Sequence, residues 1–123
     1  MNRLKIASLE VSGVCLGAMN FGTTTPEKDA FEILDAFVAA GGNFIDTSNN
    51  YAHWQGTGDE SETVLGRWLA SRGNRDKVVI ATKVGFDRHG SGQGLKRSQI
   101  EYWIDESLKK LQTDYVDLYY AHT

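Results

Sequence analysis

Four polar residues have types and positions that suit proton transfer. Asp46 and Lys83 end the apolar runs NFID and VVIATK, and His122 ends YVDLYYAH. A charged group at the end of a buried strand costs several kcal/mol unless it is paired, so Asp46 and Lys83 are expected to form an ion pair. Tyr51 follows Asp46 in the polar stretch TSNNY. An ammonium group favours phenolate, so Lys83 would make Tyr51 a better acid, while His122 could orient a substrate oxygen.

Alternating strands and helices must position these residues. Short β-branched runs predict strands, and apolar residues at helical spacing predict the helices between them. Thr25 is expected to cap the first helix, and Ser98 with Glu101 could form a capping box on the third. The expected elements are a hairpin at 3–12, strands near 14–16, 43–46, 77–83 and 115–122, and helices at 26–40, 61–72 and 97–111.

Two α/β architectures fit this order: a doubly wound sheet and part of an eight-stranded (β/α) barrel. The first strand-to-helix turn reads LGAMNFGTTTPE and has no G-x-G-x-x-G, so a dinucleotide-binding Rossmann loop is not supported. The strand-end residues Asp46, Lys83 and His122 lie about one βα unit apart. They should therefore meet at one rim of a parallel sheet.

The composition indicates a small-molecule partner. The chain has 123 residues, 41% of them hydrophobic, and a net charge of −3 with no long basic run, which argues against nucleic acid or an anionic membrane surface. No apolar stretch is long enough to span a membrane, and the N-terminus is too polar for a signal peptide, so we expect a cytoplasmic protein. No linker divides the chain, and residues 1–123 are expected to form a single domain.

Several segments resemble the aldo-keto reductases. GGNFIDTSNNY is similar to the segment that carries that family's aspartate and tyrosine, and VVIATKVG is similar to its lysine strand. GDESETVLGRWL resembles its second helix with the E-x-x-L-G pattern, and SLKKLQTDYVDLYYAH its third helix and histidine strand. The resemblance implies a (β/α) barrel of TIM type, with only its first four strands present here, after an N-terminal β-hairpin.

The resemblance also implies roles for individual residues. Tyr51 would donate a proton to the carbonyl oxygen, Lys83 would lower the pKa of that phenol, Asp46 would hold Lys83, and His122 would orient the carbonyl. NADPH would supply the hydride for reducing an aldehyde or ketone. Its nicotinamide would lie against Gly17, Ala18 and Met19 and near Asp46, and the substrate would contact Tyr51, Trp54 and His122.

Family members are about twice as long as this chain. Four open parallel strands would leave two unpaired edges, so we expect either a missing C-terminal half or self-association to complete the barrel. Most contacts with the cofactor would then come from the strands and loops that complete the barrel. Lys96 stands where relatives often cap the third helix with serine, so that helix could begin nearer Ser98.

Two other functions remain open. A non-catalytic module could bind a nicotinamide cofactor for sensing on the same scaffold. A lyase or aldolase could use Lys83 to form a Schiff base, although pairing with Asp46 would make that amine a poor nucleophile.

Other conspicuous residues have structural explanations. Asp117 points away from His122 on the same strand and should bond behind the sheet, and Cys15 is expected to be a buried, inert thiol. His53 is a loop residue, and His89 lies in a glycine-rich loop. The three histidines are too scattered to indicate a metal site.

Overall fold

The computed structural model describes residues 1–86 and 94–122, so His89 lies outside the described residues. Within these residues the fold is α/β: an antiparallel hairpin precedes four parallel strands that alternate with three α-helices. Along the sheet the strands follow their order in the chain. The hairpin strands are β1 (Arg3–Ile6) and β2 (Leu9–Ser12), and the parallel strands are β3 (Cys15–Gly17), β4 (Phe44–Asp46), β5 (Val79–Val84) and β6 (Leu118–Ala121).

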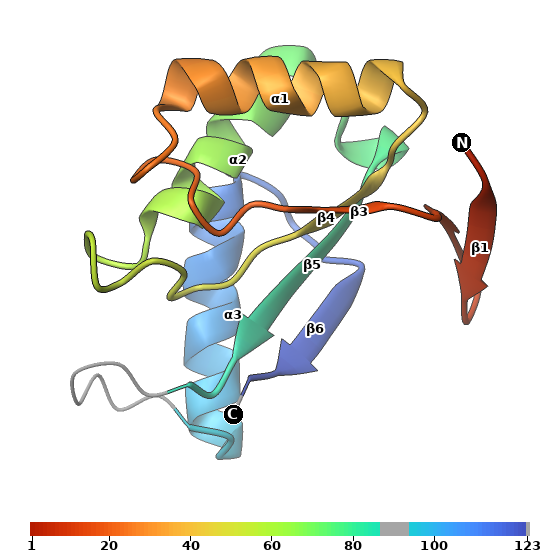
Figure 1. Cartoon of the computed structure of the whole chain (residues 1–123). Coiled ribbons are helices and arrows are strands. Elements are labelled where there is room, and N and C mark those ends of the chain that lie inside the picture. Colours follow the sequence, from red (N-terminus) through yellow and green to blue (C-terminus); the bar gives the residue numbers. More distant parts are fainter. Residues whose placement is uncertain (87–93, 123) are drawn as a thin grey trace.

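The helices lie together along one face of the parallel sheet, and the hairpin lies apart from them near the start of β3 (Figure 1). Side chains from this helical face, among them Ile45, Ile80 and Trp68, form the hydrophobic core. The opposite face is partly uncovered, and its Tyr120 is 39% exposed. The helices are α1 (Glu27–Ala39), α2 (Glu60–Arg72), α3 (Arg97–Leu111) and the short 3₁₀ helix η1 (Arg75–Lys77).

The N-terminal caps of two helices differ from the sequence prediction. Pro26 occupies the N-cap of α1 without a side-chain hydrogen bond, because Thr25 is held in the preceding turn by backbone bonds to Asn20 and Gly22. Helix α3 begins at Arg97, and the Lys96 N–H donates to Gln99 Oε1 at 3.1 Å. The predicted cap by Thr25 and the predicted capping box of Ser98 with Glu101 are therefore wrong, whereas the predicted range of the third helix, 97–111, is confirmed.

The predicted burial of Cys15 is also wrong. Cys15 is exposed, since β3 is an edge strand of the sheet. Nearby protein atoms and the Asp46 carboxylate nevertheless raise the pKa of the Cys15 thiol to about 11. The thiol thus stays protonated at neutral pH.

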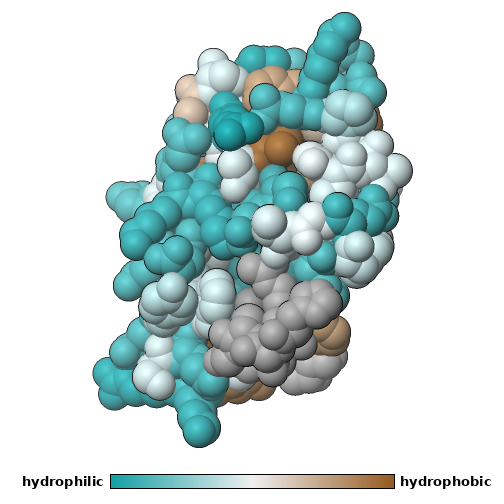
Figure 2. Space-filling view, turned by 90° about the vertical axis from the view of Figure 1, so that its left-hand side faces the viewer, coloured by the Kyte–Doolittle hydropathy of each residue, from teal (hydrophilic) through white to brown (hydrophobic). Residues whose placement is uncertain are grey.

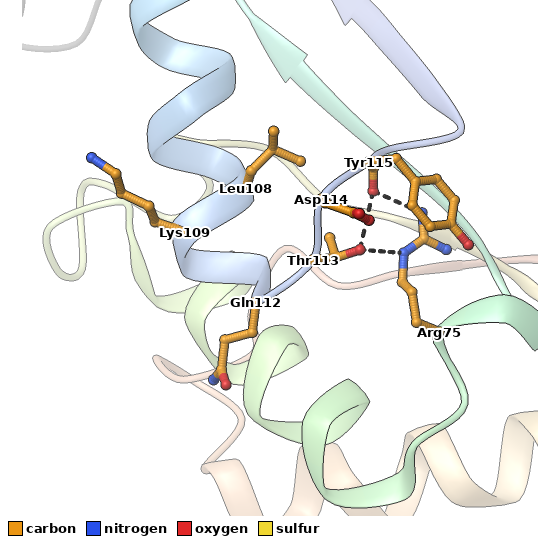
Figure 3. A pocket seen from close by; sticks show the side chains of 7 residues that line it. All are labelled: Arg75, Leu108, Lys109, Gln112, Thr113, Asp114 and Tyr115. Carbon is orange, nitrogen blue, oxygen red and sulfur yellow. Dashed lines mark hydrogen bonds between the residues drawn. The ribbon is translucent and has the colours of Figure 1, made fainter.

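Arg75 fixes the turn that leads into β6. Its guanidinium donates to Thr113 Oγ1 and to the backbone oxygen of Tyr115 (Figure 3). It also donates to the backbone oxygen of Val78 and to Asp117 Oδ2 at 2.9 Å. Asp117 also accepts the N–H of Ile80, which confirms its predicted structural position behind the sheet. The hollow beside Arg75, about 740 Å³, lies at the amino end of β6, away from Lys83.

The E-x-x-L-G segment holds α2 against its neighbours. Glu62 is fully buried and accepts the Thr82 hydroxyl at 2.7 Å, which connects α2 to β5. At Gly66 the backbone of α3 comes so close that an added Cβ would lie 2.0 Å from the oxygen of Lys110. This segment of the sequence therefore has a packing role.

Replacing Gly66 with alanine is expected to destabilise the protein by about 2 to 3 kcal/mol, because backbone atoms of α3 must move to accept the methyl group. The matched control is Gly17→Ala, since nothing lies within 4 Å of a Cβ at Gly17. Urea unfolding followed by circular dichroism measures both variants. Equal stability of Gly66→Ala and the unsubstituted protein would show that α2 and α3 are less closely packed.

Candidate active site

The predicted strand-end residues meet at the carboxyl rim of the sheet. Gly17 pairs with Asp46 across β3 and β4, and Asp46 pairs with Ala81 across β4 and β5. Lys83 lies two residues beyond Ala81 on the same side of β5, while His122 directly follows β6. Parallel strands in consecutive order bring these positions to one edge.

Lys83 is the centre of a compact hydrogen-bond cluster. Its Nζ donates to Asp46 Oδ2 at 2.8 Å, to the backbone oxygen of Thr47 at 2.7 Å, and to the hydroxyl of Tyr51. The side chains of Lys83 and Asp46 are 14% and 26% exposed. Three donated bonds use all three hydrogens of an ammonium group, so the expected pairing of Asp46 with Lys83 is present.

The electrostatics of Tyr51 differ from the sequence expectation. Burial and the hydrogen bond that Tyr51 donates to Asp46 Oδ2 at 2.8 Å raise the pKa of its phenol above the ordinary value. Asp46 therefore opposes the acidifying effect expected from Lys83, because it stabilises the protonated phenol. At neutral pH the tyrosine therefore carries its proton.

His122 lies beside Tyr51, with ring centroids 6.2 Å apart. Its Nδ1 is 3.3 Å from Ser48 Oγ, and burial followed by the charge of Lys83 lowers the pKa of the imidazole. His122 is thus mainly neutral at pH 7. A small cavity of about 170 Å³ adjoins these rings, lined by Met19, Asn50, Tyr51, His53, Trp54, Phe86 and His122.

The residues predicted to contact a cofactor differ in how far they are exposed at the rim. Gly17 leaves open space on the inner side of the rim, and Met19 is 39% exposed. Ala18 is fully buried, and its backbone oxygen accepts the Ser61 hydroxyl. Ala18 therefore supports the rim, while Gly17 and Met19 remain accessible to a ligand.

Sequence reasoning did not single out Ser48, Asn50 or Phe86. Ser48 donates its hydroxyl to Asn50 Oδ1 at 2.8 Å, and Asn50 Nδ2 donates to the backbone oxygen of Phe86 at 3.2 Å. The sequence signal that could have indicated these two residues is the pair of polar residues at positions 48 and 50, just after the end of a strand. Viewed from the side on which the loop after β4 lies, most of the coloured surface is hydrophilic (Figure 2).

Comparison with known proteins identifies the family of this site. Residues 13–123 match the aldo/keto reductase family. The chain belongs to that family. Norsolorinic acid reductase B of Aspergillus parasiticus is 45% identical over 94% of this chain, and the putative aryl-alcohol dehydrogenase AAD6 of Saccharomyces cerevisiae is 40% identical over 96%.

Solved reductases share the fold. The aldo-keto reductase AKR11C1 from Bacillus halodurans, in its holo form, is 32% identical over 99% of this chain, with a TM-score of 0.81. The alignment covers 40% of that structure, and the chain spans 33% of norsolorinic acid reductase B. This aldo-keto reductase chain thus corresponds to the hairpin and first four strands of a TIM-type barrel. Across the residues that the structure describes, no helix is long and apolar enough to cross a membrane.

Proposed function

We propose that this chain carries the carbonyl-reducing centre of an NADPH-dependent aldo-keto reductase. The observation that carries the proposal is the contact of the Lys83 ammonium with both Asp46 and the Tyr51 hydroxyl at the strand rim. Hydride addition to a carbonyl carbon builds negative charge on its oxygen. Tyr51 donates a proton to that oxygen, Lys83 stabilises the phenolate that remains, and Asp46 holds Lys83 in place.

Proton donation requires a change of partner at Tyr51. In the structure its hydroxyl hydrogen points to Asp46, which keeps the phenol protonated. A substrate oxygen that acquires negative charge competes with Asp46 for this hydrogen. Because Lys83 also contacts the phenol oxygen, the ammonium remains in place to offset the new negative charge.

The rim residues fit a flat nicotinamide ring. The open space at Gly17 and the exposed Met19 leave room against the end of β3, next to Asp46. When bound there, NADPH supplies the hydride. Gly17 and Met19 would support the ring, whereas the rest of the cofactor would be held by strands that complete the barrel, supplied by a C-terminal half or a second copy.

The cavity favours a planar carbonyl substrate. His53, Trp54 and Phe86 add aromatic surface beside Tyr51 and His122, and Trp54 is 61% exposed. Aromatic side chains bury flat rings well in stacked or edge-on contact. The name of one relative, the putative aryl-alcohol dehydrogenase AAD6, agrees with an aromatic carbonyl substrate.

One experiment distinguishes the reductase from a nicotinamide-binding sensor and from a Schiff-base lyase. The completed barrel, meaning this chain together with the C-terminal half or second copy that supplies the missing strands, is mixed with NADPH and an aromatic aldehyde. Both cofactor oxidation and alcohol formation are followed. We expect the two to proceed in equal amounts, with no substrate trapped on Lys83 by borohydride. Cofactor binding without oxidation would instead favour a nicotinamide-binding sensor, and trapping on Lys83 would favour a Schiff-base lyase.

A further inference from the structure

The first turn of α2 holds the ends of two strands on the helical face of the sheet. Ser61 Oγ donates at 2.7 Å to the backbone oxygen of Ala18, which directly follows β3. The same Oγ lies 2.6 Å from Thr47 Oγ1, and Thr47 directly follows β4. All three residues are fully buried, so water does not compete for these bonds. The Ser61–Thr47 hydroxyl pair therefore joins the ends of β3 and β4 to one helix.

The direction of both bonds follows from the Ala18 oxygen. A backbone oxygen can only accept, so its 2.7 Å contact uses the single hydroxyl hydrogen of Ser61. Ser61 Oγ can then only accept from Thr47, whose hydroxyl hydrogen points to it. The reverse arrangement would leave the Ser61 and Ala18 oxygens in close contact with no hydrogen between them. One serine hydroxyl thus serves both strand ends.

Thr47 also contacts the catalytic ion pair through its backbone. Its oxygen accepts Lys83 Nζ at 2.7 Å, and its N–H donates to the oxygen of Ala81 at 2.9 Å. The preceding residue, Asp46, is another acceptor of Lys83. A shift of the Thr47 peptide would therefore change two of the three contacts that the ammonium group makes.

We propose that Ser61 and Thr47 are positioning residues, whose hydroxyl pair fixes the strand ends that hold Lys83 and face the cofactor. The consequence for catalysis rests on the proposed reductase function. Ala18 belongs to the rim segment against which the nicotinamide would lie, and it is held by Ser61. Ser61 thus acts on both the cofactor side and the Lys83 side of the site, whereas Thr47 acts on the Lys83 side.

Chemical labelling of lysines tests the position of Lys83 without any substrate. The completed barrel is treated with a limiting amount of acetic anhydride, and peptide mass spectrometry compares Lys83 with the exposed Lys28. In Thr47→Val a methyl group replaces the hydroxyl, and a carbon atom cannot remain 2.6 Å from Ser61 Oγ. The Thr47 peptide must shift and weaken one acceptor of Lys83. Labelling of Lys83 relative to Lys28 should then rise roughly threefold or more, because the amine must leave its acceptors to react.

Matched variants separate the hydroxyl pair from general damage to the fold, and urea unfolding measures the stability of each. Thr47→Ser keeps the hydroxyl and should label like the unsubstituted protein. Ser71→Ala removes another serine hydroxyl of α2, which bonds to Trp68 and Arg72, and should also change nothing. Where Thr47→Val does not fold, Ser61→Ala removes the same bond without adding a methyl group, and labelling should rise there too.

Two outcomes of the labelling experiment would overturn the proposal. The first is unchanged labelling of Lys83 in the folded Thr47→Val or Ser61→Ala protein. The second is a rise in Thr47→Ser as large as that in Thr47→Val, because the hydroxyl would then have no part in holding Lys83.

Kinetic and binding measurements on the completed barrel separate the two strand ends. In Thr47→Val, kcat for carbonyl reduction should fall roughly tenfold or more through the displaced Lys83, while the Kd of NADPH stays unchanged. Ser61→Ala should lower kcat and also raise the Kd of NADPH by roughly threefold. This rise is less than a whole hydrogen bond provides, because the Phe21 N–H still bonds the Ala18 oxygen.

The pattern of these results distinguishes the positioning role from the reductase function. An equal Kd of NADPH in Ser61→Ala and Thr47→Val would overturn the role of Ser61 at β3. No turnover in the unsubstituted protein, with the labelling of Lys83 as expected, would count against the reductase function alone.

Discussion

Replacing Tyr51 with phenylalanine is expected to lower carbonyl reduction by roughly 10²- to 10⁴-fold, the usual contribution of a positioned proton donor. The substitution removes one oxygen atom and keeps the ring that packs against His122. Lys83 retains Asp46 and the Thr47 backbone oxygen as partners, so the rim should keep its shape. Steady-state kinetics with an aromatic aldehyde, together with NADPH fluorescence titration, measure the effect in the completed barrel.

The binding of NADPH should change little in Tyr51→Phe, since the loss falls on proton transfer. The matched control is Tyr102→Phe, because Tyr102 lies on α3, is 57% exposed and has its ring beside Trp103. Equal turnover in Tyr51→Phe and the unsubstituted protein would remove Tyr51 from the mechanism. A loss of cofactor binding as large as the loss of rate would assign Tyr51 a binding role instead.

The ion pair of the site was predictable because burying a charge constrains the sequence strongly. Asp46 and Lys83 each end an apolar strand, and the regular length of a βα unit places both at one rim, so each is the other's evident partner. The parallel order of the strands followed from the same spacing. These features depend on periodicity and charge, which a sequence displays directly.

Other features depend on contacts that the sequence does not display. The hydrogen bonds of Ser48 and Asn50 require the backbone oxygen of Phe86, whose position depends on how β5 ends beside the loop after β4. Serine and asparagine are common loop residues, so their types did not distinguish these two positions from other loop residues. Cys15 illustrates the reverse problem, since its apolar run suggested burial while its place on an edge strand exposes it.

The pKa of Tyr51 also required the structure. Sequence reasoning considered only the ammonium of Lys83, which favours phenolate, whereas the Asp46 oxygen that binds Lys83 also accepts the phenol hydrogen. Burial adds to this effect. The net pKa therefore depends on which of two neighbours the hydroxyl faces.

A pair of substitutions at Lys83 and Asp46 separates stability from chemistry. Lys83→Met leaves the mostly buried Asp46 carboxylate without its cation and should cost about 2 to 3 kcal/mol, a cost reduced from that of a fully buried pair by partial exposure. Asp46→Asn, which leaves the ammonium unpaired, should cost a similar amount. In the double variant Asp46→Asn/Lys83→Met neither charge remains, so most of the stability should return.

Activity should follow a different pattern, because Tyr51 lacks the ammonium in both Lys83→Met and the double variant. We expect each to lose roughly 10²-fold or more in kcat even where urea unfolding shows recovered stability. Arg67→Met is the control, since Arg67 pairs with Glu27 on the exposed surface and should affect neither property appreciably. Normal turnover in the double variant would mean that Lys83 and Asp46 form a structural ion pair only. Removing both charges together should relieve the loss of folding stability that an unpaired charge causes in each single variant. A double variant as unstable as the single variants would therefore mean that charge pairing does not determine the stability of this site.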